Sequence, residues 1–335
     1  MTAPLLEVSG LTVGFATAGR VVPVVRDLSF QLDRGKTLVI VGESGSGKSV
    51  TCLALMGLLA RPAGRVLAGS MRLACKDGTV RDIARLEPED MQRIRGAEIA
   101  MIFQEPMTSL NPVYTIGEQI VEAVQFHDAV SARAARARAA EMLALLGIPD
   151  PAARLNSYPH ELSGGMRQRA MIGMALACRP ALLIADEPTT ALDVTVQAQI
   201  LDLLRRLQRE LGMAMIFVTH NLGVAGEIAD NVLVMYAGQC AEAGPREAVF
   251  ATPRLPYTMG LLRAVPRLGL DRAAGPLATI PGSVPDLAHL PRGCAFHPRC
   301  VFFRPGLCDA RDPELEPCGK GHQVRCLRWR DIVAE

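Results

Sequence analysis

The chain has few aromatic residues and little net charge. Phe, Trp and Tyr make up only 4% of its 335 residues, and the formal net charge is +2. Proteins that bind nucleic acids usually carry a clear basic excess, and those that bind single strands stack bases on aromatic side chains. We therefore expect no nucleic-acid partner.

Long hydrophobic runs are also missing. No stretch of about eighteen uncharged apolar residues occurs, so we expect no transmembrane helix. The start of the chain, Met1–Glu7, lacks the basic segment and apolar core of a signal peptide, which favours a cytoplasmic location. The composition, 49% hydrophobic and 21% charged, is that of a globular protein large enough for two domains.

A glycine-rich segment carries the first chemical signal. Residues 42–49 read Gly-Glu-Ser-Gly-Ser-Gly-Lys-Ser and fit the phosphate-binding pattern G-x-x-x-x-G-K-[ST]. An apolar strand over 37–41 precedes them, and an apolar helix from Val50 to Leu59 is expected to follow. In this pattern backbone N–H groups and the helix N-terminus bind phosphate, Lys48 reaches the β- and γ-phosphates, and the Ser49 hydroxyl binds Mg²⁺. The alternative is a chance Gly/Ser-rich turn. The candidate ATP-binding residues are Gly42, Glu43, Ser44, Gly45, Ser46, Gly47, Lys48 and Ser49.

Two further apolar strands end in groups that suit ATP hydrolysis. The run from Ala181 ends at Asp186 and Glu187, at the strand edge where open α/β sheets bind ligands. Asp186 can hold Mg²⁺, and Glu187 can orient or deprotonate an attacking water. The strand from Met213 ends at His220, which could contact a γ-phosphate. The alternatives are a solvated strand end and a structural histidine.

Two other signals are ambiguous by themselves. Ser163, Gly164 and Gly165 open an apolar helix, which makes either a second anion site or a local N-cap. Phe15 follows an alternating strand, where it could stack on an adenine or belong to the core.

The nine cysteines are unevenly distributed. Cys52, Cys75, Cys178 and Cys240 lie in apolar stretches and are expected to be buried thiols. The other five crowd the end of the chain, which in a reducing compartment favours metal over disulfides. Their spacing lacks the paired C-x₂-C of zinc ribbons, and four thiolates from irregular loops suit an iron–sulfur cluster. Unligated thiols or disulfides remain the alternative. These five are Cys294, Cys300, Cys308, Cys318 and Cys326.

Taken in order, these elements resemble the ATP-binding cassette ATPases. The resemblance assigns the phosphate loop, Q-loop, signature, Walker B pair, D-loop and switch histidine to residues 42–49, Gln104, Leu162–Arg169, Asp186–Glu187, Asp193 and His220. The segments 42–51, 99–112 and 255–258, with the cysteine tail, are similar to the ATP-binding subunits of oligopeptide, dipeptide and nickel importers.

The resemblance implies an α/β fold with several parts. A nucleotide-binding cassette with a phosphate-loop parallel-sheet core and an N-terminal antiparallel β subdomain is expected over 1–255. Its helical signature subdomain covers about 105–175. A cysteine-rich C-terminal extension of the peptide-transporter type is expected over 256–335.

The same resemblance implies roles for the remaining residues. Phe15 and Gln104 would contact ATP. Ser49 and Asp186 would bind Mg²⁺, and Gln104 would contact this ion as well. Lys48, Glu187 and His220 would be catalytic. Ser163, Gly164, Gly165 and Asp193 would serve the ATP of a second cassette. The iron–sulfur ligands would be Cys294, Cys300, Cys308 and Cys326, with Cys318 as an alternative to Cys326.

The implied function is ATP hydrolysis that powers import of di- or oligopeptides, with ATP, Mg²⁺ and a 4Fe-4S cluster as cofactors. The implied partners are a second, different cassette subunit, two transmembrane permease subunits and an extracytoplasmic substrate-binding protein. The chain would lie peripherally at the cytoplasmic face of the cell membrane. Transport of nickel or another small solute, export, and a cassette ATPase outside transport are the alternatives.

Overall fold

The computed structural model describes residues 3–17, 19–104, 109–190, 193–265 and 279–332. Parts of the importer-like segment 99–112 and of the predicted C-terminal extension 256–335 fall outside these ranges. The chain divides into two compact units, which are described separately below. The first unit comprises Met1–Leu6, Leu32–Lys36 and Arg72–Phe217, and the second comprises Glu7–Gln31, Thr37–Met71 and Val218–Glu335.

The second unit contains the strand that leads into the phosphate loop. This strand, β3 (Thr37–Val41), is buried at every position because it is apolar on both faces. It pairs in parallel with β9 (Asn231–Tyr236), with Val39 opposite Val232. Antiparallel strands continue the sheet in the order β3-β9-β10-β12-β11. The added strands are β10 (Gln239–Pro245), β12 (His322–Val324) and β11 (Glu316–Gly319).

A smaller sheet in the same unit contains most of β1 (Leu6–Thr17), β2 (Arg20–Leu32) and β4 (Gly64–Ala74), in the order β2-β1-β4. The first residues of β1 alternate between buried and partly exposed, as the alternating sequence predicts. The helices of this unit are α1 (Lys48–Leu55), α9 (Leu222–Ile228), α10 (Arg246–Ala251) and α11 (Pro256–Arg263). Helix α1 begins and ends earlier than the predicted Val50–Leu59.

The first unit contains the strands that carry the predicted carboxylates. Its strands run in the order β8-β7-β6, and β6 pairs in parallel with β7 so that Met101 lies opposite Ile184. The carboxyl ends of β6 and β7 therefore lie at the same sheet edge. The strands are β6 (Ile99–Ile102), β7 (Leu182–Asp186) and most of β8 (Ala214–Thr219).

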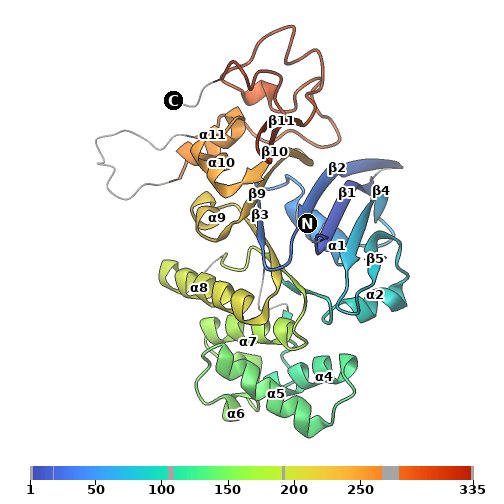
Figure 1. The fold of residues 1–335 in the computed structure, drawn as a ribbon, viewed down its shortest axis with the longest axis vertical. Helices are drawn as coiled ribbons and strands as arrows, with labels where there is room; N and C mark the ends of the chain where they lie inside the picture. The colour runs from blue at the N-terminus through green and yellow to red at the C-terminus, as the bar shows by residue number, and fades with distance from the viewer. Residues whose placement is uncertain (1–2, 18, 105–108, 191–192, 266–278, 333–335) are drawn as a thin grey trace. The chain divides into compact units, whose positions relative to one another are not determined.

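Helices form the rest of the first unit. The region 115–156 is three helices, because Asp128 and Gly147 end the first two. Ser131 caps the second of these helices, since its hydroxyl accepts the Ala134 N–H. Helices α4, α5 and α7 pack against one another (Figure 1). The helices are α2 (Pro88–Ile94), α4 (Ile116–His127), α5 (Ala132–Leu145), α6 (Pro151–Arg154), α7 (Gly164–Leu176) and α8 (Val194–Leu211).

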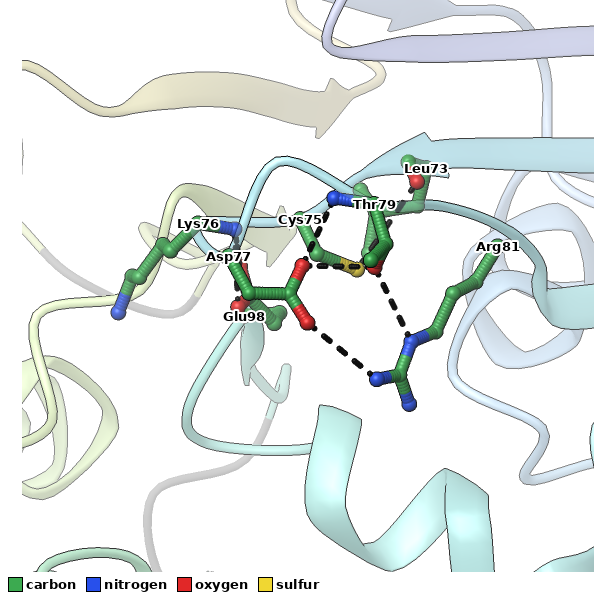
Figure 2. Close-up of polar contacts among 7 residues, drawn as sticks. All are labelled: Leu73, Cys75, Lys76, Asp77, Thr79, Arg81 and Glu98. Carbon is green, nitrogen blue, oxygen red and sulfur yellow. Dashed lines mark hydrogen bonds and ion pairs between the residues drawn. The ribbon is translucent and has the colours of Figure 1, made fainter.

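A tight hairpin holds the start of β6 in place. It joins the end of β4 to β5 (Val80–Asp82), and Asp77 closes its turn by accepting the Thr79 N–H at 2.9 Å (Figure 2). The backbone N–H of Lys76 donates to both carboxylate oxygens of Glu98, each at 3.1 Å. Glu98 directly precedes β6, so the hairpin fixes the strand that ends next to Gln104. Within the described ranges, no helix is long and apolar enough to cross a membrane.

Candidate functional site

The phosphate-loop sequence folds as a strand, glycine turn and helix. Gly47 caps α1 with φ +100°, a conformation that glycine adopts without strain. A Cβ at Gly42 would lie 2.3 Å from the carbonyl oxygen of Met235, so only glycine fits there. The loop backbone can therefore turn tightly at the N-terminus of α1, which is the geometry that binds phosphate.

Lys48 lies inside this loop. Its buried ammonium donates to the carbonyl oxygens of Gly42 at 2.8 Å and Glu43 at 3.0 Å. The Ser46 hydroxyl is also buried, and it has no hydrogen-bond partner among the described residues. A buried cation and an unpaired hydroxyl in a glycine-rich turn suit an anionic ligand with several oxygens.

The second unit also contains Phe15 and His220. Phe15 lies on β1 and is half-buried, and a Cβ at Gly64 would be 2.7 Å from its Cε1. The aromatic edge thus packs over a glycine and keeps part of its surface exposed. His220 is exposed and directly follows β8. Their roles toward ATP stay predictions.

The first unit brings Gln104 and Glu187 together. The Gln104 amide lies 3.5 Å from Glu187 Oε2, and the same oxygen accepts the Thr190 hydroxyl at 2.9 Å. Asp186 is the last residue of β7 and is buried. The parallel pairing of β6 with β7 explains the approach, because each side chain follows the carboxyl end of its strand.

Glu187 has an unusual backbone. Its φ is +47°, which non-glycine residues rarely adopt and which is enriched at functional sites. Two bonds hold the turn: the Thr190 N–H donates to the Glu187 carbonyl at 3.1 Å, and the buried Gln168 amide donates to the Pro188 carbonyl at 2.6 Å. Gln168 belongs to α7, so this helix directly supports the carboxylate turn.

The predicted partner-ATP residues lie at helix starts. The Ser163 hydroxyl accepts the Met166 N–H at 3.3 Å and caps α7, and Asp193 accepts the Val196 N–H at 2.9 Å and caps α8. Ser163 therefore forms the local N-cap, and its expected contact with the ATP of a second cassette stays a prediction. Gly164 and Gly165 have open space where a Cβ would be, so a ligand can approach their backbone closely.

The cysteines separate into the two groups that the sequence suggests. Cys52, Cys75, Cys178 and Cys240 are buried thiols, as predicted. Burial raises the pKa of Cys240 to about 12, with a smaller lowering by Arg325 and a raising by Glu242. This thiol therefore stays protonated and unreactive at neutral pH.

Four of the five C-terminal cysteines face one small cavity. Its wall includes Phe296, Phe302 and Ile332. The pKa of the Cys294 thiol is raised to about 11, mainly by burial and to a smaller extent by the neighbouring Cys300 and Cys308. The four that line the cavity are Cys294, Cys300, Cys308 and Cys326.

Cys318 is placed differently. It lies on β11 and is absent from this cavity wall. The pKa of its thiol is raised, first by burial and then by the Glu242 carboxylate. Across the described residues, no group of three or more His, Cys, Asp or Glu side chains has the arrangement of a metal site. The structure thus gathers the four predicted thiols without forming a metal-binding geometry.

Sequence reasoning missed two residues beside the phosphate loop. Glu43 is bound through its carboxylate by Arg299 and through its backbone N–H by Tyr257. Tyr257 lies in the importer-like segment 255–258 and Arg299 directly precedes Cys300, but neither position signals a contact so distant along the chain.

The fold, with a phosphate loop after a parallel strand and a carboxylate pair at a parallel sheet edge, is that of a nucleotide-binding ATPase cassette. Residues 25–190 match the family described as ABC transporter, and residues 241–308 match the family described as oligopeptide/dipeptide transporter, C-terminal region.

Relatives match over nearly the whole chain. A putative peptide import ATP-binding protein of Brucella melitensis is 56% identical over 335 residues, covering 99% of each chain. The dipeptide transport ATP-binding protein DppD of Escherichia coli is 48% identical over 322 residues, covering 96% of each. The solved dimeric structure of the ATP-binding cassette MJ0796 bound to ADP and Pi has a TM-score of 0.62 at 26% identity, covering 72% of this chain and 98% of that one. This chain belongs to the ABC transporter family, among the ATP-binding proteins of oligopeptide/dipeptide-type import systems.

Proposed function

We propose that this chain is the ATP-hydrolysing subunit that powers import of di- or oligopeptides through a membrane ABC transporter. The observation that carries ATP hydrolysis is the position of Glu187, held at a strand edge by Gln104 and Thr190. The match of residues 241–308 to the oligopeptide/dipeptide transporter region supports a peptide substrate, and so do the peptide and dipeptide relatives.

The roles follow from the chemistry of each group. Lys48 binds the β- and γ-phosphates, while the loop backbone and Ser46 bind phosphate oxygens. Phe15 stacks on the adenine. Glu187 orients or deprotonates the attacking water, Gln104 positions it, and His220 contacts the γ-phosphate.

Ser49 and Asp186 supply hard oxygen ligands of the kind that Mg²⁺ prefers, with Gln104 as a further contact. When bound, this ion would neutralise charge on the phosphate oxygens. The chain's own contribution is to hold the buried Asp186 carboxylate at the end of β7.

A second cassette completes the assembly. Ser163, Gly164, Gly165 and Asp193 bind the ATP held by that subunit, and the open space at both glycines supports this role. We propose that the second cassette is a different subunit, that two permease subunits form the pore, and that an extracytoplasmic protein delivers the peptide. The chain then lies peripherally at the cytoplasmic face of the membrane.

Uptake measurements test the substrate. Cells that carry Glu187→Gln in place of the native chain should lose uptake of a labelled dipeptide and keep uptake of labelled nickel ions. Loss of nickel uptake with normal dipeptide uptake would transfer the proposal to a nickel importer. No effect on either would favour another solute, export, or an ATPase outside transport.

We propose further that the four cavity-lining cysteines hold a 4Fe-4S cluster. The support for this proposal is that four cysteines line one cavity, and a 4Fe-4S cluster takes four thiolate ligands. Cys318 lies outside this wall and is the matched control. Anaerobically purified chain should contain about four iron and four acid-labile sulfide per molecule, and Cys308→Ser should lower both while Cys318→Ser does not. Absence of iron and sulfide from the native chain would reject the cluster.

A further inference from the structure

The side chain of Glu43 is bound by the C-terminal extension. Arg299 Nη1 donates to Oε2 of Glu43 at 2.7 Å, and Nη2 donates to Oε1 at 2.9 Å. This two-point pairing is the strongest geometry between a guanidinium and a carboxylate. Arg299 lies in the short helix His297–Arg299, directly before Cys300, so the extension reaches the second residue of the phosphate loop.

The surroundings hold Arg299 in one position. Its side chain is only 4% exposed. Nε donates to the Pro281 carbonyl at 2.8 Å, and Nη1 also donates to the Tyr236 hydroxyl at 3.4 Å. The guanidinium carbon lies 5.9 Å from the ring centroids of Tyr236 and Phe296. Arg299 is thus a fixed, desolvated cation, and loss of its partner would leave a buried charge.

The backbone of Glu43 is bound on both sides as well. Its N–H donates to the buried hydroxyl of Tyr257 at 2.8 Å, and its carbonyl accepts the Lys48 ammonium at 3.0 Å. The Tyr257 ring packs on Tyr236 and Phe296, at centroid distances of 4.7 and 5.3 Å. One aromatic cluster therefore supports both contacts to Glu43.

We propose that Arg299 and Tyr257 are positioning residues that set the affinity of the phosphate loop for ATP. This inference rests on the proposed ATP site at residues 42–49. The C-terminal extension then contributes directly to nucleotide binding. Arg299 neutralises a carboxylate that would otherwise repel phosphate, and Tyr257 fixes the peptide unit between Gly42 and Glu43.

The charges predict the sign of each substitution. Arg299→Gln leaves the Glu43 carboxylate without its counter-charge beside bound phosphates, so ATP binding weakens. Glu43→Gln leaves Arg299 buried without a carboxylate and disturbs the loop. The double variant removes both charges, so its effect should be smaller than the sum of the two single effects. Arg299→Lys should restore affinity only in part, since an ammonium cannot pair at two points.

Equilibrium binding of a fluorescent ATP analogue to the purified full-length chain tests this, together with KM and kcat for ATP in the transporter complex. Arg299→Gln should raise Kd about tenfold and raise KM more than it lowers kcat. Tyr257→Phe should raise Kd by a smaller factor. Arg304→Gln, an exposed arginine of the same extension, is the matched control and should bind as the native chain does.

Three outcomes separate the proposals. Native Kd in Arg299→Gln and Glu43→Gln, with binding abolished by Lys48→Ala, would overturn the positioning role alone. Native binding in Lys48→Ala would overturn the proposed ATP site instead. If Arg299→Gln does not unfold cooperatively, Glu43→Gln and Tyr257→Phe decide, and unchanged affinity in both overturns the inference.

Discussion

Glu187 has a strained backbone that hydrogen bonds hold in place, a combination often found at reaction centres. A non-glycine residue at φ +47° is held against its own preference by the turn that Thr190 closes. This backbone conformation directs the Glu187 carboxylate from the carboxyl end of β7 toward the Gln104 amide. Glu187 Oε2 accepts hydrogen bonds from both the Gln104 amide and the Thr190 hydroxyl, and these two bonds fix the orientation of the carboxylate.

Replacing Glu187 should separate chemistry from binding. Gln keeps the size of the side chain and an oxygen that accepts the Thr190 hydroxyl, but it cannot take a proton from water. We expect Glu187→Gln to lower ATP turnover by about 10²-fold or more while the Kd for ATP stays near that of the native chain. Steady-state hydrolysis and fluorescent-nucleotide binding measure the two quantities.

Glu314→Gln at an exposed position of the extension is the control for that experiment. It should leave both quantities unchanged. Native turnover in Glu187→Gln would show that another group activates the water.

At the scale of elements, the end of α4 carries a titrating group. His127 is the last residue of the helix, and its ring lies where a Cβ at Gly96 would be 2.7 Å from Nε2. Burial lowers the pKa of His127 below its ordinary 6.5; Asp128 opposes this and Lys76 adds to it. The imidazole is therefore neutral in the folded protein at neutral pH.

This depressed pKa predicts a loss of stability on acidification. Between the folded pKa and 6.5 the unfolded chain binds more protons than the folded chain, so the free energy of unfolding falls as the pH drops below 6.5. His127→Gln should reduce this dependence between about pH 7 and pH 5. Urea titrations of both chains across that range measure the difference. Equal slopes against pH would contradict the assigned burial of the imidazole.

At the scale of the whole molecule, the C-terminal extension is built into the second unit. Strand β12 pairs with β10, with Val324 opposite Glu242. The Glu242 carboxylate is fully buried and binds His322 Nε2 at 2.8 Å; it also accepts the Arg254 N–H at 2.7 Å and the Leu255 N–H at 3.2 Å. This one side chain joins a core strand to the segment before α11 and to the extension.

Glu242→Ala should therefore destabilise the protein strongly. It leaves two backbone N–H groups and a buried imidazole without their acceptor, which costs about 3 kcal/mol or more. The free energy of unfolding in urea measures the loss. Glu314→Ala, at an exposed position, should stay close to the native value. A free energy of unfolding close to the native value in Glu242→Ala would mean that the extension is not coupled to β10 through this residue.

Local chemistry in the sequence predicts much of this structure. The buried strands at 37–41, 182–186 and 214–219 follow from apolar runs, and the cap at Ser131 from its side chain. The meeting of Gln104 with Glu187 follows from both residues ending neighbouring parallel strands, once the fold is inferred from the ordered motifs.

What sequence reasoning missed depends on pairing between distant segments. Arg299 and Glu43 are 256 positions apart, and no local periodicity indicates that they meet. Helices α9, α10 and α11 are short, so their apolar patterns are too brief to distinguish them from loops.

The most direct test of the central proposal is ATP hydrolysis by the membrane complex that co-purifies with this chain. Turnover should be measured with and without a dipeptide and the matching extracytoplasmic binding protein. The complex that contains Glu187→Gln is the negative control for ATP hydrolysis. We predict that peptide and binding protein together stimulate hydrolysis, and that neither does so alone. Steady hydrolysis that no peptide changes would contradict peptide import, and hydrolysis that persists at the native rate in the Glu187→Gln complex would contradict the assigned site.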